Sequence, residues 1–329
     1  YREALRSKPD YTETHYNLGT ALYECGQLDS SMAHLREALR LNPGYCEAHN
    51  NLGNVLAVME KPEDAVFHYR EAMRLKPCYA EAITNLGNVH QRLQGRMDEG
   101  IACHRQAISC DPDYADAHYN LAFCLLLKGE FREGWREYDW RWKRSGGVRR
   151  PLPTVTDATD LKDRRVFLHS EQGLGDELFF LRFLHELKRR GVEHVAYRAG
   201  PKLAPLLGRV PQIDRIAVAT EKPKTDDLAF AIGDLPLVLG IEQPDQLPLP
   251  LSLTALPSQQ QSLSTLLADL GPPPYIGVSW RAGTPDQKLS LYKTCPISLI
   301  ASAFKDVPGT LLILQRHPAP GEIEAFARE

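Results

Sequence analysis

The sequence lacks several features that mark whole classes of protein. Its 329 residues contain no run of about 18 apolar residues, so no membrane-spanning helix is expected. The first residues are charged and carry no apolar segment typical of a secretory signal. The formal net charge is only −3, which argues against a dedicated nucleic-acid-binding protein. The remaining composition predicts about two globular domains and excludes collagen-like, disordered and disulfide-scaffold proteins.

The cysteines show no arrangement that predicts a metal or disulfide site. No C-x-x-C pair occurs, and no cysteines and histidines cluster at metal-ligand spacing. An odd number of scattered cysteines is typical of a reducing compartment, where buried thiols act as small apolar side chains. We therefore expect a cytoplasmic protein with buried thiols and no metal or resident cofactor. The seven cysteines are Cys25, Cys46, Cys78, Cys103, Cys110, Cys124 and Cys295.

An internal repeat fills the first part of the chain. Asn-Leu-Gly begins at Asn17, Asn51 and Asn85, and Asn-Leu-Ala begins at Asn120, which gives spacings of 34, 34 and 35 residues. Prolines keep the same spacing, and an alanine stands five residues before each of them. Because several independent positions share one phase, this part of the chain resembles the tetratricopeptide repeat.

The resemblance implies a solenoid of paired amphipathic helices. One helix pair cannot bury its apolar face alone, so neighbouring pairs stack. Small residues such as Gly53 and Ala65 allow the two helices of a pair to approach closely. Tyr1 occupies a position inside the second helix of a repeat, so we expect further sequence upstream of this chain. The predicted division is a partial repeat at 1–11, repeats at 12–45, 46–79 and 80–114, and a modified last repeat at 115–144.

Asparagines recur on the first helix of each predicted pair. An asparagine side chain can both donate to and accept from a peptide backbone. A concave groove that binds a protein or an extended peptide is one interpretation, and contacts between helices or with solvent are the other. Repeat arrays of this kind also self-associate. The six candidate groove residues are Asn17, Asn51, Asn54, Asn85, Asn88 and Asn120.

The last repeat is rich in aromatic residues. Its second helix carries Trp135, Tyr138, Trp140 and Trp142. A terminal repeat must cover the open apolar end of the solenoid, so we expect this face to be buried against a following domain. Stacking of a sugar on the tryptophans is the alternative.

A different architecture follows residues 145–162, which we interpret as a linker. Short apolar runs alternate with helical stretches in 163–270, and this alternation predicts a parallel α/β domain. A second α/β segment begins at 271 and extends to 329, so that a cleft between two α/β halves is expected. Strands are expected at 165–170, 194–198, 215–219, 227–232, 275–279 and 310–315, and helices at 176–190, 201–209, 235–239, 296–304 and 322–328.

The turn after the first expected strand reads Glu-Gln-Gly-Leu-Gly-Asp and ends at Asp176. Gly173 and Gly175 allow close approach of a ligand, and the start of a helix favours an anion. The turn is neither a G-x-G-x-x-G fingerprint nor a Walker A loop. Asp176 is either a general base for an acceptor hydroxyl or a plain helix-capping residue.

The stretch GLGDELFFLRFLHELKRRG resembles the first turn of heptosyltransferase-type glycosyltransferases, which have the GT-B fold. The resemblance implies that Asp176 is the catalytic base. Repeats followed by GWREYDWRW and EQGLGD look like a bacterial group of repeat proteins with such a domain, and the layout is similar to the protein O-GlcNAc transferases. The implied fold is therefore a tetratricopeptide-repeat solenoid followed by a GT-B pair of Rossmann-type α/β domains, the second one incomplete.

A second motif follows the strand expected at 275–279. In the resembled family, a loop of small residues and a basic residue three before a proline hold the phosphate of a nucleotide-sugar donor. Gly283, Thr284 and Lys293 fit that pattern, and a fixed cation would stabilise the charge that develops on the phosphate. Lys288 competes with Lys293 for the role, and Arg281 could contribute. A solvated lysine and a surface ion pair are the alternatives.

These observations lead to one principal hypothesis. The chain is expected to belong to a glycosyltransferase that moves a sugar from a nucleotide-diphosphate donor, its co-substrate, to an acceptor presented by the repeats. No metal is required where a lysine neutralises the donor phosphate. The alternatives are an interaction scaffold with a degenerate transferase domain, and a regulator that binds a nucleotide without sugar transfer.

Overall fold

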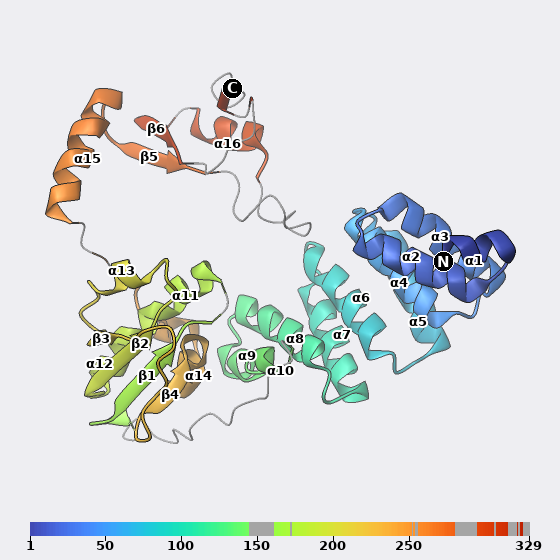
Figure 1. Cartoon of the computed structure of the whole chain (residues 1–329), viewed down its shortest axis with the longest axis horizontal. Coiled ribbons are helices and arrows are strands. Elements are labelled where there is room, and N and C mark those ends of the chain that lie inside the picture. The colour runs from blue at the N-terminus through green and yellow to red at the C-terminus, as the bar shows by residue number, and fades with distance from the viewer. Residues whose placement is uncertain are drawn as a thin grey trace. The chain divides into compact units, whose positions relative to one another are not determined.

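The computed structural model describes residues 1–144, 161–171, 173–251, 253, 256–279, 295–305, 307–314, 321 and 323–324. The residues form two compact units, Tyr1–Leu253 and Thr254–Glu329 (Figure 1). The division expected from the sequence placed 257–270 with the preceding α/β residues, whereas the structure groups this helix with the second unit.

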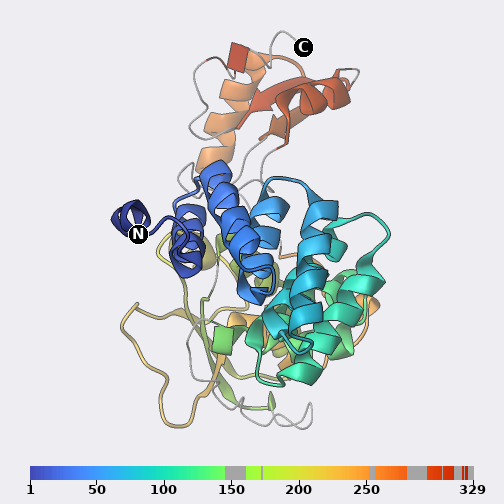
Figure 2. The same ribbon diagram turned by 90° about the vertical axis from the view of Figure 1, so that its right-hand side faces the viewer.

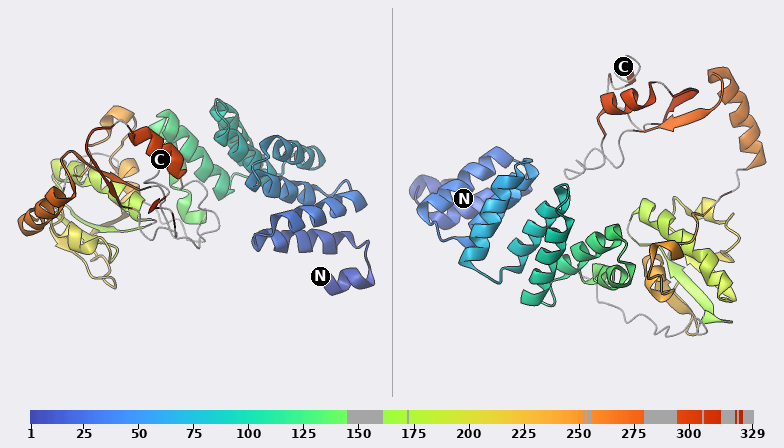
Figure 3. Two further views of the ribbon diagram at one scale, coloured as in Figure 1. Left: turned by 90° about the horizontal axis from the view of Figure 1, so that it is seen from above. Right: turned by 180° about the vertical axis from the view of Figure 1, so that it is seen from behind.

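Antiparallel helix pairs build the first part of the Tyr1–Leu253 unit. Helices α2 and α3, α4 and α5, α6 and α7, and α8 and α9 pack against one another as pairs, and successive pairs lie side by side (Figures 2 and 3). Each of the four predicted repeats from 12 to 144 therefore contains one pair, and the partial repeat at 1–11 contains the single helix α1. The helices are α1 (Arg2–Ser7), α2 (Thr12–Glu24), α3 (Leu28–Leu41), α4 (Cys46–Val58), α5 (Pro62–Leu75), α6 (Ala80–Arg92), α7 (Met97–Cys110), α8 (Ala115–Lys128), α9 (Phe131–Tyr138) and α10 (Arg141–Arg144).

The repeated glycine sets how closely the helices of a pair approach. A Cβ atom on Gly53 would lie 2.6 Å from Cε1 of Tyr69, so the aromatic ring uses the space that glycine leaves. Leu52 and Leu56 on the same helix are buried beside it. Each fully buried leucine contributes about 1.5–3 kcal/mol, so the apolar stripe of each helix stabilises the stack.

A four-stranded parallel sheet follows in the same unit. Its strands are β1 (Arg165–His169), β2 (His194–Arg198), β3 (Arg215–Ile216) and β4 (Leu228–Ala231), in the order β3-β2-β1-β4. Val166 of β1 is in register with Val195 on one side and Leu228 on the other. Strands β2 and β3 are added on one side of β1, and the chain then crosses to the other side of β1 to form β4. The carboxyl ends of β1 and β4 therefore flank the topological switch point of the sheet.

The helices around the sheet are shorter than the sequence pattern predicts. One helix was expected over 176–190, but the structure has α11 (Leu174–Phe180), the 3-10 turn η2 (Leu181–Phe183) and α12 (Leu184–Arg189). The other helical segments are α13 (Ala204–Leu207), η3 (Ile232–Asp234), α14 (Leu235–Val238) and η4 (Pro244–Gln246).

The last repeat packs directly on the sheet domain. Phe131, Trp135 and Tyr138 of α9 belong to the same buried cluster as Phe180 and Leu235. The rings of Trp135 and Phe180 have their centroids 6.2 Å apart. The expectation that the aromatic face of the last repeat is buried against the following domain is confirmed for Trp135 and Tyr138, whereas Trp140 is half-buried and stacks on His118 of the same repeat.

The Thr254–Glu329 unit contains a small parallel pair of strands. It consists of α15 (Pro257–Leu270), β5 (Tyr275–Val278), α16 (Ile297–Phe304) and β6 (Thr310–Ile313). Val278 and Ala301 form its small core. Across the parts of the chain that the structure describes, no helix is long and apolar enough to cross a membrane.

The expectation of buried thiols is wrong for most of the cysteines. Only Cys124 among the seven is buried, while Cys25, Cys78 and Cys295 are exposed. The reason is their position at helix ends and turns: Cys78 follows α5, and Cys110 is the last residue of α7. The ends of the helix pairs face solvent, whereas the buried apolar residues lie along the middle of the helices, where the helices pack against one another.

Candidate functional site

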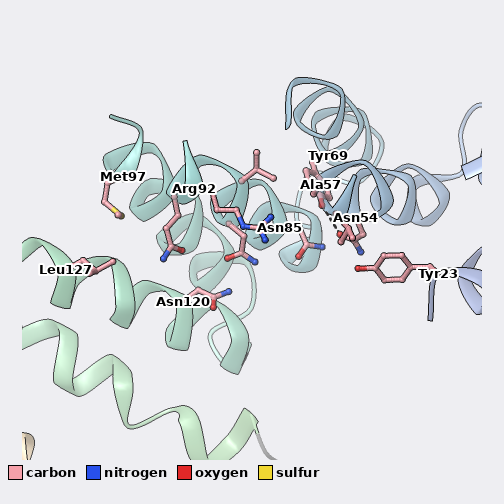
Figure 4. A pocket seen from close by; sticks show the side chains of 13 residues that line it. Tyr23, Asn54, Ala57, Tyr69, Asn85, Arg92, Met97, Asn120 and Leu127 are labelled. Atoms are coloured by element: carbon pink, nitrogen blue, oxygen red, sulfur yellow. Dashed lines mark hydrogen bonds between the residues drawn. The ribbon is translucent and has the colours of Figure 1, made fainter. Parts of the chain in front are cut away.

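A groove of about 400 Å³ crosses the stacked helix pairs (Figure 4). Most of its lining comes from the first helices of the pairs, α2, α4, α6 and α8, with one residue each from α5 and α7. The site therefore spans four successive repeats and is elongated along the solenoid. Its lining residues are Tyr23, Asn54, Ala57, Val58, Tyr69, Asn85, Asn88, Val89, Gln91, Arg92, Met97, Asn120 and Leu127.

Four of the six predicted asparagines lie in this groove, and two do not. Asn54, Asn85, Asn88 and Asn120 are in its lining. Asn51 lies outside it and donates from Nδ2 to Oγ1 of Thr20 at 3.0 Å, which is a contact between helices of adjacent repeats. Asn17 is exposed on α2, also outside the groove.

The groove asparagines differ in how their amides are used. Oδ1 of Asn54 accepts a hydrogen bond from the Tyr69 hydroxyl at 2.8 Å. Nδ2 of Asn85 donates to Oδ1 of Asn50 at 3.1 Å. Neither Asn88 nor Asn120 makes a side-chain hydrogen bond to any residue that the structure describes. The groove therefore presents amide groups whose bonding capacity is not used within the described chain.

The groove also contains residues that the sequence reasoning missed. Tyr23 and Tyr69 contribute hydroxyls, and burial raises the pKa of both, so they stay neutral at physiological pH. Among the described lining residues, Arg92 is the single charged side chain. A signal for such positions was present, because Tyr23, Ala57 and Gln91 are spaced by 34 residues and all three line the groove.

A buried charge cluster lies at the switch point of the sheet. The guanidinium of Arg141 on α10 donates to Oε1 of Glu171 at 2.7 Å and also pairs with Asp234. Glu171 comes just after β1, and Asp234 ends the turn after β4. The last repeat thus supplies a cation to the carboxyl ends of both strands.

Burial and charge act in opposite directions on the Glu171 carboxyl. Burial raises its pKa, while the Arg141 guanidinium lowers it, and the net pKa is raised. Oε1 also accepts from the Gly233 N–H at 3.1 Å. Glu171 therefore connects the β1 turn to the β4 turn and to the last repeat.

The glycine turn after β1 faces open space. A Cβ atom on Gly175 would meet no heavy atom within 4 Å, and Gly173, Gly175 and Asp176 are all exposed. Oδ2 of Asp176 accepts from the Gly173 N–H at 3.4 Å, which is a long capping contact. The capping interaction is thus present, and the carboxylate remains open to solvent.

Gly173 and Gly175, which were also predicted to approach the donor phosphate, belong to this exposed turn. The other five predicted donor-phosphate residues lie outside the described residues: Gly283, Thr284, Lys293, Arg281 and Lys288. Within the described ranges, no three histidine, cysteine, aspartate or glutamate side chains gather as metal ligands would.

The fold and the groove define a helical-repeat protein joined to a parallel α/β domain. Residues 19–59 and 91–129 match the family model of the TPR repeat. The chain therefore contains tetratricopeptide repeats, and such repeats indicate a role in protein–protein interaction.

Individual relatives are distant. Protein FlbA of Caulobacter vibrioides is 28% identical over 232 aligned positions, and the match covers 59% of this chain. The chain spans 37% of the length of this curated relative. A crystal structure of MamA is 23% identical with a TM-score of 0.40, covering 44% of this chain and 85% of that one. The first TPR of Spaghetti (RPAP3), bound to the HSP90 peptide SRMEEVD, is 15% identical with a TM-score of 0.34, covering 36% of this chain and 92% of that one.

Proposed function

We propose that the repeats bind an extended segment of a protein or peptide in the groove. The observation that supports this most is the pair of amides on Asn88 and Asn120, which face one elongated groove without a hydrogen-bond partner among the described residues. An amide can donate to a peptide carbonyl and accept from a peptide N–H. Asparagines in a row therefore suit an extended backbone of varied sequence.

The lining also favours one kind of ligand. The described lining residues supply apolar surface from Val89, Met97 and Leu127 and a guanidinium on Arg92, and they include no carboxylate. A carboxylate near a cation is stabilised, and a second cation is repelled. We therefore propose a segment that carries apolar side chains and an acidic one rather than a basic segment.

The test is selection from a random peptide library followed by titration. The selected peptide should bind Asn88→Ala/Asn120→Ala more weakly than the wild type by about 5- to 150-fold, because two hydrogen bonds of about 0.5–1.5 kcal/mol each are lost. Asn17→Ala is the matched control, since Asn17 is exposed outside the groove. Equal affinity for the double variant and the control would refute the proposal.

Glycosyl transfer is the second candidate function, as part of a GT-B enzyme of the reducing cytoplasm whose repeats present the acceptor. It is supported by the exposed carboxylate of Asp176 at an open glycine turn after β1. Asp176 would deprotonate the acceptor hydroxyl. Gly173, Gly175 and Lys293, with the loop at 283–284, would approach the donor phosphates.

Transfer is tested on the intact protein with a panel of nucleotide sugars. The first measurement is thermal shift, because a ligand that binds only the folded state raises its stability. The second is transfer of labelled sugar by the wild type and by Asp176→Asn. Unchanged transfer by Asp176→Asn would refute the role of Asp176 as the catalytic base. A protein that binds peptide but no nucleotide sugar would be an interaction scaffold.

A further inference from the structure

Two cysteines of neighbouring repeats lie in contact. Cys110 is the last residue of α7, and Cys78 lies in the turn between α5 and α6. Their Sγ atoms are 2.7 Å apart, with the Cys110 thiol donating to Cys78. The residues stand 32 positions apart in the chain. Neither thiol belongs to the groove or to the glycine turn.

The pair is a departure from the repeat pattern. The positions equivalent to Cys110 in the two preceding repeats are Leu41 and Leu75, and the position equivalent to Cys78 in the preceding repeat is Gly44. The two cysteines therefore lie together at one place in the solenoid, and each stands at a position where the preceding repeat has no thiol.

We propose that Cys78 and Cys110 are an oxidation site that forms a reversible disulfide. A disulfide bond is about 2.05 Å long, so the sulfur atoms need to move together by only about 0.65 Å from their 2.7 Å separation. Cys78 is exposed, so a small oxidant can reach its sulfur.

The reaction needs a disulfide as its oxidant, and oxidised glutathione is a small molecule of that class. The Cys78 thiolate attacks one sulfur of the oxidant, which breaks that S–S bond and releases one glutathione thiolate. The Cys110 thiolate then attacks the Cys78 sulfur of the mixed disulfide and releases the second glutathione. Two protein thiols are oxidised, two glutathione sulfurs are reduced, and the two thiol protons pass to solvent or to the released thiolates.

The hydrogen bond suits this order of events. The pKa of Cys110 is raised, chiefly because its thiol donates to Cys78. Cys110 is therefore less readily ionised than an ordinary thiol while it lies beside Cys78. The more accessible sulfur is the one that the oxidant meets first.

The bond would close a loop that contains α6 and α7. A cross-link stabilises a fold mainly by restricting the unfolded chain, and the restriction grows with loop length. We expect the oxidised protein to melt higher than the reduced one by on the order of 5–10 °C. The rise should disappear on treatment with dithiothreitol.

The experiment incubates the whole chain with oxidised glutathione, blocks remaining thiols and maps the peptides by mass spectrometry. A peptide pair linked through Cys78 and Cys110 in the monomer, with a raised melting temperature, is the expected result. Cys110→Ser should retain glutathione on Cys78 and show no such rise. Cys295→Ser, which removes an exposed thiol elsewhere, should behave as the wild type. Separate glutathione adducts on both cysteines of the wild type, or dimers linked through them, would overturn the proposal.

Discussion

Replacing Arg141 by methionine should lower the free energy of unfolding by about 3–5 kcal/mol. The side chain is 5% exposed and pairs with Glu171 at 2.7 Å and with Asp234. Methionine fills much of the space but leaves the carboxylates of Glu171 and Asp234 without this cation, as well as that of the buried Asp139, 4.0 Å from it. Because 1.36 kcal/mol is a factor of ten, the folding equilibrium should fall by roughly 10²- to 10⁴-fold.

The loss should depend on pH in a defined direction. Burial already raises the pKa of Glu171, and removal of Arg141 takes away the charge that opposes this rise. A folded-state pKa above the unfolded one gives stability that is present below the unfolded pKa and lost as pH rises through the folded pKa. The deficit of Arg141→Met should therefore be larger at pH 8 than at pH 5.

Urea unfolding, followed by circular dichroism and tryptophan fluorescence, measures both effects. Arg132→Met is the matched control, because its exposed side chain pairs with Glu242 at the same joint between repeat and sheet domain, and surface pairs contribute little. The triple variant Arg141→Met/Glu171→Gln/Asp234→Asn should regain much of the lost stability. A loss no larger than that of the control, or one that does not change with pH, would refute the reasoning.

Two further predictions concern the packing of the repeats. Gly53→Ala should lower the free energy of unfolding in urea by about 1–3 kcal/mol, because the new Cβ would lie 2.6 Å from the Tyr69 ring. The control Gly44→Ala lies at an exposed turn with room for a Cβ and should lower it much less. Equal losses in the two variants would contradict the packing argument. His104 is fully buried with both ring nitrogens unpaired among the described residues, and burial lowers its pKa to about 4. Because the folded-state pKa lies below the unfolded one, the folded protein loses up to roughly 3 kcal/mol of stability as pH falls from about 6.5 towards 4. His104→Leu should therefore melt at a higher temperature than the wild type, and the difference should be larger at pH 5 than at pH 7. Identical pH dependence of the two melting temperatures would argue against this role of His104.

The repeats were predictable because their signals are local. The positions of Asn-Leu-Gly, proline and alanine share one phase, and a 34-residue period places each helix pair in the chain. Gly53 could be recognised as a close-approach residue for the same reason. The phase of the repeat identified the first helix of each pair but not the direction in which every asparagine side chain points. The amide of Asn51 donates a hydrogen bond to Thr20, whereas Asn88 faces the groove.

The charge cluster at the switch point could not be predicted. Arg141 stands in a short basic stretch that is typical of a solvated helix end, while its partners lie 30 and 93 positions away. No local pattern distinguishes a buried arginine from an exposed one. The break in the helix expected at 176–190 had no local signal either, since Leu181, Phe183 and Leu184 are all buried and continue the apolar pattern through the 3-10 turn.

The central claim is that asparagine amides of the groove contact a bound peptide. Selective ¹⁵N labelling of asparagine reports each side-chain amide by nuclear magnetic resonance, and single Asn→Gln variants assign Asn17, Asn88 and Asn120. On titration with the peptide selected from the library, the Nδ2 resonances of Asn88 and Asn120 should shift while that of Asn17 does not. A bound peptide that leaves both groove amides unshifted, or that shifts Asn17 alone, would contradict the proposal.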